Sequence, residues 1–132
     1  MIGQVSENPE IAPVILVADN DKHGRAFLVA ALSGAGYRVL AASDGLEALK
    51  IITQCEGAID LLLADLIMPG MDGRALAERI GQCFPRVKLL LTSGFPAGAA
   101  RHFGYLADTP FIEKPICLSA LRRKVKDLLA GR

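Results

Sequence analysis

Several short apolar runs in this 132-residue sequence end in a charged side chain. Asp19 follows VILVA, Asp65 follows LLLA, and Lys114 lies within FIEKPI. Carboxylates about 4 Å apart repel each other by roughly 4 kcal/mol at an effective dielectric of 20, so such a cluster needs a cation. Carboxylates bind Mg²⁺, and an adjacent lysine ammonium completes a site that receives phosphoryl oxygens. These residues therefore predict phosphoryl chemistry with Mg²⁺, and Asp65 is the candidate nucleophile.

The elements that must position these residues form a repeating pattern of apolar runs and helical segments. Strands are predicted at 13–19, 37–42, 59–65, 87–93 and 109–114, and helices at 22–35, 44–55, 72–84, 97–106 and 117–130. This alternation indicates an α/β fold with a doubly wound parallel five-stranded sheet. In such a sheet, sites form at the carboxyl ends of the strands.

Four of the five predicted strands bring polar residues to that edge of the sheet. They are Asp19, Asn20 and Asp21 after the first strand, Asp65 in the third, Thr92 and Ser93 in the fourth, and Lys114 with Pro115 in the fifth. Exposure of the following loops to solvent would explain polar residues at the ends of one or two strands. It does not explain a lysine inside FIEKPI, or an aspartate directly after four apolar positions. We therefore expect these side chains to converge on one site.

Residues that begin and end helices support the predicted boundaries. Ser43 or Asp44 can cap the second helix, with Glu47 close behind, and Gly34 and Gly36 can end the first helix. The last helix is expected to begin at Ser119 or near it. The Gly- and Pro-rich surroundings of residues 97–106 predict that the fourth helix is the least stable element.

The overall composition favours a single domain without a strong global charge. The net charge is +1, from 15 basic and 14 acidic residues, which gives no reason to expect direct binding to nucleic acid or to a membrane surface. No apolar stretch approaches the roughly 20 residues of a membrane span. We expect a flexible lead over residues 1–12 and one domain over 13–130. The absence of a signal-peptide pattern and three unpaired cysteines predict a cytoplasmic protein.

Three motifs in this order resemble the receiver domain of response regulators in two-component signalling, the CheY-like superfamily. They are DLLLADLIMPGMDG, LLLTSGF and FIEKPI, and the resemblance extends from about Pro13 to Leu129. It implies a flavodoxin-like (βα)5 fold with strand order 2-1-3-4-5. It also implies that Asp65 receives a phosphoryl group from the phosphohistidine of a histidine kinase or of a histidine phosphotransfer domain, and that the transfer depends on Mg²⁺.

The resemblance also assigns roles to residues around Asp65. The backbone carbonyl of Ile67 would bind the metal, Lys114 would pair with a phosphoryl oxygen, and Pro115 would follow a cis peptide bond. Ser93 is the expected switch hydroxyl because Gly94 after it leaves room, and Thr92 is the alternative. Phe111 matches the aromatic residue that changes rotamer with the switch, although simple core packing also explains it.

The chain departs from the family at the acidic end of the first strand. Matching the family places Asp19 at the first acid, Asn20 at the second and Asp21 at the third, and the second acid is the usual direct metal ligand. Asn20 keeps an oxygen donor but lacks the charge, so weaker Mg²⁺ binding is expected. A register shift of one residue would make Asp19 the direct ligand instead.

Phosphorylation is expected to change the surface formed by the fourth helix, the fifth strand and the fifth helix. That surface would contact an unidentified downstream protein or a second copy of the chain. The residues two positions after Asp65 and Ser93 are Ile67 and Phe95, which cannot orient an attacking water. We therefore expect slow self-dephosphorylation and no other enzymatic activity.

Other functions fit parts of the pattern. A pseudo-receiver that binds partners without phosphorylation is favoured by Asn20. A phosphohydrolase with an aspartate nucleophile would usually carry a second acid at the position of Ile67. A flavin-binding protein of the same architecture would need a phosphate loop rich in Ser, Thr and Gly after the first strand, which the sequence lacks.

Overall fold

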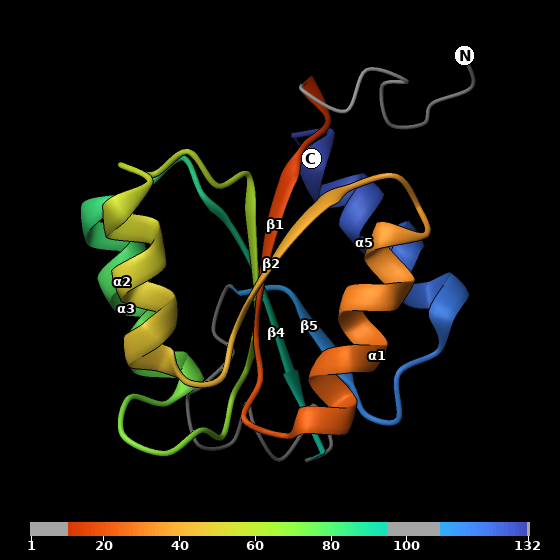
Figure 1. Cartoon of the computed structure of the whole chain (residues 1–132), viewed down its shortest axis with the longest axis horizontal. Helices are drawn as coiled ribbons and strands as arrows, with labels where there is room; N and C mark the ends of the chain where they lie inside the picture. Colours follow the sequence, from red (N-terminus) through yellow and green to blue (C-terminus); the bar gives the residue numbers. More distant parts are fainter. Residues whose placement is uncertain (1–10, 95–108, 132) are drawn as a thin grey trace.

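The computed structural model describes residues 11–94 and 109–131. Five parallel strands form one sheet in the order β2-β1-β3-β4-β5 (Figure 1). They are β1 (Val14–Ala18), β2 (Arg38–Ala42), β3 (Leu61–Asp65), β4 (Lys88–Ser93) and β5 (Phe111–Glu113). This is the predicted strand order. All neighbouring strands run parallel, which the helices that connect them make possible.

Helices cover both faces of this sheet, as Figure 1 shows. They are α1 (Lys22–Ser33), α2 (Gly45–Gln54), α3 (Gly73–Cys83) and α5 (Leu118–Leu129). The helices α2 and α3 lie on one face, and α1 and α5 lie on the other. The predicted doubly wound α/β class is therefore confirmed. The helix predicted at 97–106 lies outside the described residues. Among the described helices, none is long and apolar enough to cross a membrane.

The sheet buries apolar side chains on both faces, which explains the run LLLAD. Successive residues of a strand point to opposite faces. Leu62 belongs to the cluster under α2 and α3, whereas Leu61 and Leu63 belong to the cluster under α1 and α5. All five residues of β3 are buried. A central strand covered on both sides needs no alternation of polar and apolar residues.

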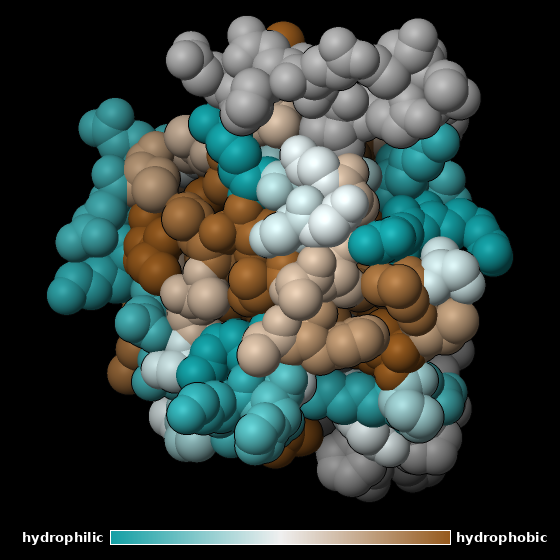
Figure 2. Space-filling view, turned by 45° about the vertical axis from the view of Figure 1, so that its right-hand side comes forward, coloured by the Kyte–Doolittle hydropathy of each residue, from teal (hydrophilic) through white to brown (hydrophobic). Residues whose placement is uncertain are grey.

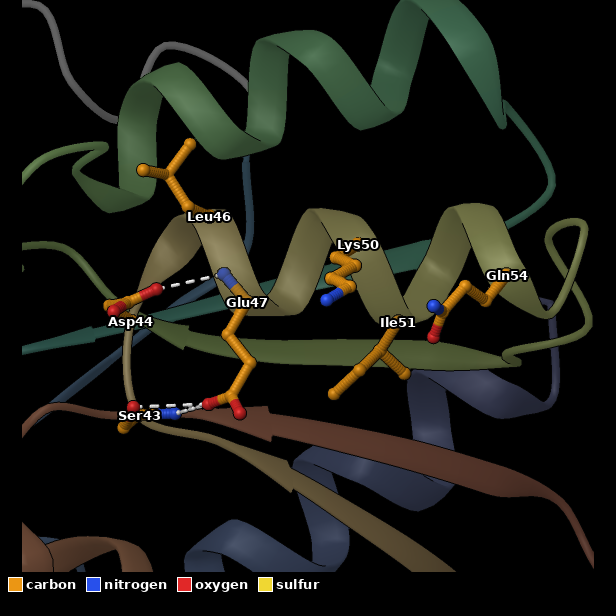
Figure 3. A pocket seen from close by; sticks show the side chains of 7 residues that line it. All are labelled: Ser43, Asp44, Leu46, Glu47, Lys50, Ile51 and Gln54. Atoms are coloured by element: carbon orange, nitrogen blue, oxygen red, sulfur yellow. Dashed lines mark hydrogen bonds between the residues drawn. The ribbon is translucent and has the colours of Figure 1, made fainter.

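Local hydrogen bonds begin and end the helices close to the predicted positions. The Asp44 side chain accepts from the Glu47 backbone N–H at 2.8 Å, and Glu47 Oε1 accepts from the Ser43 backbone N–H at 2.6 Å. Figure 3 draws both hydrogen bonds, which resemble a capping box with the Glu47 side chain bonded one residue before the N-cap. Gly34 caps the C-terminus of α1, and Gly36 has a φ of 99°, which glycine adopts without strain.

The start of α5 differs from these capped ends. Cys117 is the N-cap residue, but no side chain of this turn caps the helix, and Ser119 lies within it. The described cysteines are all free thiols. The helix instead depends on its apolar face, where Leu121 and Val125 are fully buried against the sheet.

Part of the apolar surface remains exposed on the side of the edge strand β2. Figure 2 shows apolar residues gathered over the middle of this side and bordered by hydrophilic residues. Leu40 of β2 is 40% exposed. The carboxyl ends of the strands lie at the bottom of Figure 1, and the candidate site lies at that end.

Candidate functional site

One ammonium group joins two buried carboxylates at the carboxyl end of the sheet. Lys114 Nζ lies 2.7 Å from Asp65 Oδ2 and 3.5 Å from Asp19 Oδ2. Asp65 is 8% exposed, and Asp19 is completely buried. The structure thus brings together residues from the ends of β1, β3 and β5. A carboxylate that leaves water at these positions needs a charged partner, and Lys114 supplies it.

The surrounding backbone positions Asp65 at the end of β3. Its Oδ1 accepts a hydrogen bond from the Ile67 backbone N–H at 3.2 Å. The next residue, Leu66, donates its backbone N–H to Thr92 O on β4 at 2.7 Å. Gly73 at the start of α3 packs so closely that an added Cβ would collide with the carbonyl of Asp65. The glycine of the MDG motif therefore lets α3 begin directly against the end of β3.

Asp19 is held from four directions after β1. Its backbone N–H donates to Ala42 O at 3.1 Å, and its carbonyl accepts from Arg25 Nη1 at 2.7 Å. Its Oδ1 accepts from the Asp21 backbone N–H at 2.8 Å, while Oδ2 faces Lys114. A buried carboxylate with these partners has one defined orientation, toward the ammonium of the lysine.

The electrostatics of Lys114 reflect opposing effects. Burial lowers the pKa of its ammonium, but the hydrogen bond and charge of Asp65, with smaller contributions from Asp19, raise it by more. The net pKa is above the ordinary lysine value. Lys114 is therefore a fixed positive charge at neutral pH, suited to attract phosphoryl oxygens.

The two residues after Asp19, Asn20 and Asp21, take different positions. Asn20 is exposed. Asp21 is the N-cap of α1, and its Oδ2 accepts from the Gly24 backbone N–H at 2.7 Å. In the described part of the chain, no three His, Cys, Asp or Glu side chains gather closely enough to hold a metal ion. A metal at this site would therefore need other oxygen donors besides the carboxylates.

The available donors nevertheless suit a hard divalent cation. Asp19 and Asp65 carry two charges against the single ammonium that they share. Beside them, Gly24 approaches so closely that an added Cβ would lie 3.1 Å from Asp19 Oδ2 and 2.9 Å from Asp21 Oδ2. Carboxylates, a backbone carbonyl and waters are the ligands that Mg²⁺ prefers. The donor set thus fits the expected ion.

The predicted switch residues lie on the two strands next to this site. Ser93 ends β4 and is fully buried, and its neighbour Thr92 is 1% exposed. Among the described residues, none is a hydrogen-bond partner of the Thr92 hydroxyl. Phe111 begins β5 and packs, half-buried, against the core cluster under α2 and α3. The peptide bond between Lys114 and Pro115 is cis.

Two residues beside the site, Arg25 and Gly24, were not predicted to have a role. Arg25 anchors the carbonyl of Asp19, and Gly24 allows the first turn of α1 to lie close to two carboxylates. A glycine within a helix lowers the stability of that helix by about 1 kcal/mol relative to alanine. An isolated glycine in a helical pattern therefore indicates a packing or functional reason, and this pattern could have pointed to Gly24. Arg25 gave no comparable signal, because an arginine on a helix is usually solvated.

Comparison with known proteins identifies close similarities over nearly the whole chain. A family model described as the response regulator receiver domain matches residues 15–126. The chain is 37% identical to the sensor kinase CckA of Brucella abortus over 89% of its own length, but it spans only 12% of that protein. It is 35% identical to the response regulator receiver protein CpdR of the same organism, covering 87% of this chain and 95% of CpdR.

A solved structure supports the same assignment. The crystal structure of the receiver domain from the hybrid histidine kinase CckA is 34% identical in sequence, with a TM-score of 0.74. The match covers 88% of this chain and 98% of that one.

Proposed function

Because the chain belongs to the response regulator receiver domain family, we propose that it accepts a phosphoryl group on Asp65 from a phosphohistidine. The donor is a histidine kinase or a histidine phosphotransfer domain, and the names of the relatives CckA and CpdR support a kinase partner. The single observation that carries the proposal is the contact of 2.7 Å between Lys114 Nζ and Asp65 Oδ2. It places a cation where phosphoryl oxygens would arrive next to the nucleophile.

In the proposed reaction, a carboxylate oxygen of Asp65 attacks phosphorus. The new bond from that oxygen to phosphorus forms while the bond from phosphorus to the imidazole nitrogen breaks, and the imidazole leaves. Lys114 turns part of its hydrogen bonding from Asp65 to the phosphoryl oxygens. Because its pKa is raised, it keeps its proton and offsets the charge that accumulates.

Mg²⁺ belongs to this proposal as the cofactor. Asp19 and Asp65 would hold it through carboxylate oxygens, with the amide oxygen of Asn20 and the carbonyl of Ile67 as further donors. When bound, it would neutralise negative charge on the oxygens of the transferring group. Arg25 would keep Asp19 in place during this process through its hydrogen bond of 2.7 Å to the Asp19 carbonyl.

The output of phosphorylation would be a change in protein contacts. Ser93 would turn its hydroxyl to the new oxygens, and Phe111 would repack into the space released behind it. The surface of β5 and α5 would then bind a downstream protein or a second copy of the chain. Ile67 is 51% exposed and apolar, so it offers no group to orient a hydrolytic water, which supports slow loss of the phosphoryl group.

The remaining parts of the proposal concern the limits of the domain and its location. We assign the signalling domain to residues 13–130, with no enzymatic activity beyond its own phosphorylation and dephosphorylation. The free cysteines are consistent with a reducing, cytoplasmic location.

The test is phosphorylation of the purified chain. With Mg²⁺ and either a phosphorylated histidine kinase or acetyl phosphate, the wild type should gain one phosphoryl mass that is labile in alkali. Asp65→Asn should gain none, whereas Asp60→Asn, an exposed aspartate just before the same strand, should react like the wild type. Equal labelling of Asp65→Asn and wild type would refute Asp65 as the acceptor.

Asn20 supports a second candidate function, a pseudo-receiver that binds partners without phosphorylation. Its exposed amide lacks the charge that the family usually places there. Beryllofluoride distinguishes the two functions, because it mimics a bound phosphoryl group. Changes in the amide resonances near Ser93 and Lys114 are expected for a phosphorylated receiver, and an unchanged spectrum at saturating Mg²⁺ would favour the pseudo-receiver.

A further inference from the structure

A surface hollow away from the candidate site borders the end of the edge strand β2. The pocket beside Gly24, between α1 and the segment after β5, includes Asp19 and Lys114 in its lining and therefore adjoins that site. The other hollow has a volume of about 550 Å³ and is lined by α2 together with Ser43 and Asp44, which directly follow β2. We call it the α2 hollow. None of the residues that line it belongs to the candidate site, so it needs a separate explanation.

The outer edge of β2 presents backbone groups that can pair with another strand. Its first and last residues bond to the β1 side, because the Arg38 N–H donates to a carbonyl at 3.0 Å and the Ala42 carbonyl accepts from an N–H at 3.1 Å. Leu40, between them, points the same way, since alternate residues of a parallel strand bond to one neighbour. The N–H and C=O groups of Val39 and Ala41 therefore point to the open edge of the described sheet. Such groups form a template for a further strand.

The sequence of β2 carries little protection against such pairing. RVLAA contains one charge, at its first residue, and Leu40 in its centre is 40% exposed. The other edge strand, β5, has only three residues, ends in the exposed Glu113 and is soon followed by Pro115. Proteins usually protect sheet edges with short strands, charges and prolines. Of the two edges, that of β2 is therefore the one suited to a partner.

The side chains of β2 and the α2 hollow complement one another about Leu40. Arg38 and Leu40 lie on the face covered by α2, because the last residue of β2 belongs to the core cluster on that face and side chains alternate. At that last residue, the α2 hollow contains the carboxylates of Asp44 and Glu47 against the single ammonium of Lys50. Figure 3 shows Glu47 extending from α2 on the side of Ser43. One end of the strand thus carries a cation, and the other end borders a net negative hollow on the same face.

We propose that β2 pairs with β2 of a second copy of this chain, antiparallel about a two-fold axis at Leu40, so that one sheet continues through both copies. In this register Val39 of each copy exchanges hydrogen bonds with Ala41 of the other, which uses every outward backbone group of these residues. Leu40 packs on its own counterpart. Arg38 lies opposite Ala42 of the other copy, next to the acidic α2 hollow. A two-fold contact uses the same surface on both copies, and this surface is complementary to itself.

This inference goes beyond the proposed function, because the pairing requires neither phosphorylation nor a metal ion. It also uses the edge of the sheet opposite to the surface of β5 and α5. Dimerisation of the wild type is therefore measured without Mg²⁺ and without a phosphodonor. Failure of the dimer would leave phosphorylation of Asp65 untouched, and failure of phosphorylation would leave the dimer untouched.

The first test is sedimentation equilibrium of the full chain from about 10 µM to about 1 mM. The wild type should show a monomer–dimer equilibrium. Leu40→Lys should raise the dissociation constant about tenfold or more, because two ammonium groups would face each other at the two-fold axis. The matched control is Leu118→Lys on α5, since Leu118 is 41% exposed and Leu40 is 40% exposed. The control should dimerise like the wild type.

Two results of this test would overturn the proposal. One is a wild type that stays monomeric throughout the concentration range. The other is a dimer that Leu118→Lys weakens and Leu40→Lys does not, because the contact would then lie on the side of α5.

The second test exchanges charges at the proposed contact of Arg38 with the α2 hollow. Arg38→Glu and Glu47→Lys should each dimerise less than the wild type, because each places like charges together twice. In an equal mixture of the two variants, both contacts join opposite charges. The mixture should therefore dimerise about tenfold more tightly than either variant alone. Glu47 also bonds Ser43, so thermal unfolding checks that each variant folds. A mixture that dimerises no better than its components would contradict the contact.

The third test measures the register of the two strands by cross-linking. At the centre of the proposed pairing, the two Cα atoms of Leu40 would lie about 4.5 Å apart, within the range of roughly 4.4–6.8 Å that a disulfide spans. Leu40→Cys should therefore form a covalent dimer with oxidised glutathione. The wild type controls for the native thiols, and Leu46→Cys controls for a new exposed thiol on α2. Cross-linking of Leu40→Cys no faster than that of Leu46→Cys would refute the register.

Discussion

The two ends of the sheet use charged side chains in opposite ways. At the amino end, the exposed Asp60 accepts from the Val14 backbone N–H at 2.7 Å, and Arg38 Nε donates to the Ala12 carbonyl at 2.9 Å. At the carboxyl end, Asp19 and Asp65 are buried and share the ammonium of Lys114.

The difference separates charges that serve the fold from charges that fit the proposed reaction. A charge at the amino end satisfies one backbone group and remains in water, so it costs little. At the carboxyl end, two carboxylates lose water and depend on a single cation. Such an arrangement is poorly suited to stability alone, but it fits the proposed binding of another cation and of phosphoryl oxygens. Four substitutions test this contrast.

The largest effect is expected for Lys114→Met. This change leaves Asp19 and Asp65 without their shared cation, and we expect the free energy of unfolding at pH 7 to fall by about 2 kcal/mol, less than for a fully buried pair because the lysine side chain is 30% exposed. Chemical denaturation measures it through the midpoint at an unchanged m-value. Lys50→Met, at an exposed position on α2, should change stability by less than about 0.5 kcal/mol.

The pH dependence of the wild type provides an internal control for this prediction. Because the folded-state pKa of Lys114 is raised, its contribution to stability is fully present below the ordinary lysine pKa of about 10.4. It is lost as the pH rises through the higher folded-state pKa. The stability difference between wild type and Lys114→Met should therefore be constant from pH 7 to about 9 and shrink above about pH 10. A difference that grows in alkali would contradict the assignment.

Next in size is the effect of Asn20→Asp on metal binding. The new carboxylate should increase Mg²⁺ affinity about tenfold. It should also lower the stability of the metal-free protein, because it adds a third negative charge next to Asp19 and Asp21. Isothermal titration and thermal denaturation with and without Mg²⁺ measure both effects. Glu56→Gln at the opposite end of the sheet should leave Mg²⁺ affinity unchanged. If Asn20→Asp bound Mg²⁺ no better than wild type, Asn20 would lie outside the metal site.

A smaller effect of opposite sign is expected for Thr92→Val. Within the described part of the chain the buried Thr92 hydroxyl has no hydrogen-bond partner, so replacing it with a methyl group should stabilise the fold by about 1 kcal/mol. The matched control is Thr53→Val on α2, which removes a hydroxyl that donates to the Leu49 carbonyl at 2.8 Å. This control should not stabilise. If Thr92→Val lowered the denaturation midpoint, the hydroxyl would have a partner in solution.

The smallest effect is expected for Asp60→Ala at the amino end. Loss of its exposed hydrogen bond to Val14 should lower stability by about 0.5–1 kcal/mol. The rate of phosphorylation should not change, because the residue lies at the opposite end of β3 from Asp65. A loss of phosphorylation in Asp60→Ala would remove the distinction between the two ends.

Much of this architecture could be predicted from local patterns. The observed strands and helices begin and end within about two residues of the predicted ones in the described ranges, because apolar runs, glycines and capping residues act locally. Asp65 and Lys114 also met as expected. Parallel strands bring their carboxyl ends to one edge, so two residues 49 positions apart become neighbours.

Other features depend on contacts that no local pattern contains. Asp21, which was predicted with Asp19 and Asn20 as a metal ligand, also caps α1 through its carboxylate, because the Gly24 N–H lies within reach. The Asp19 carboxylate accepts from the Asp21 backbone N–H and faces Lys114, while Arg25 fixes the Asp19 backbone carbonyl. The pocket beside Gly24 exists only because α1 and the segment after β5 pack side by side.

The amino-acid sequence by itself determined the order of the elements, the parallel sheet and the meeting of an aspartate with a lysine at its carboxyl edge. These follow from apolar periodicity and chain direction, which are properties of short segments. Only the tertiary structure decided that Asp19 shares the ammonium, that the Thr92 hydroxyl lacks a partner in the described ranges and that a pocket with an apolar wall adjoins the site. The physical reason is that a hydrogen bond or a cavity can form or disappear when the distance between two distant segments changes by a few tenths of an ångström. Side-chain packing sets these distances.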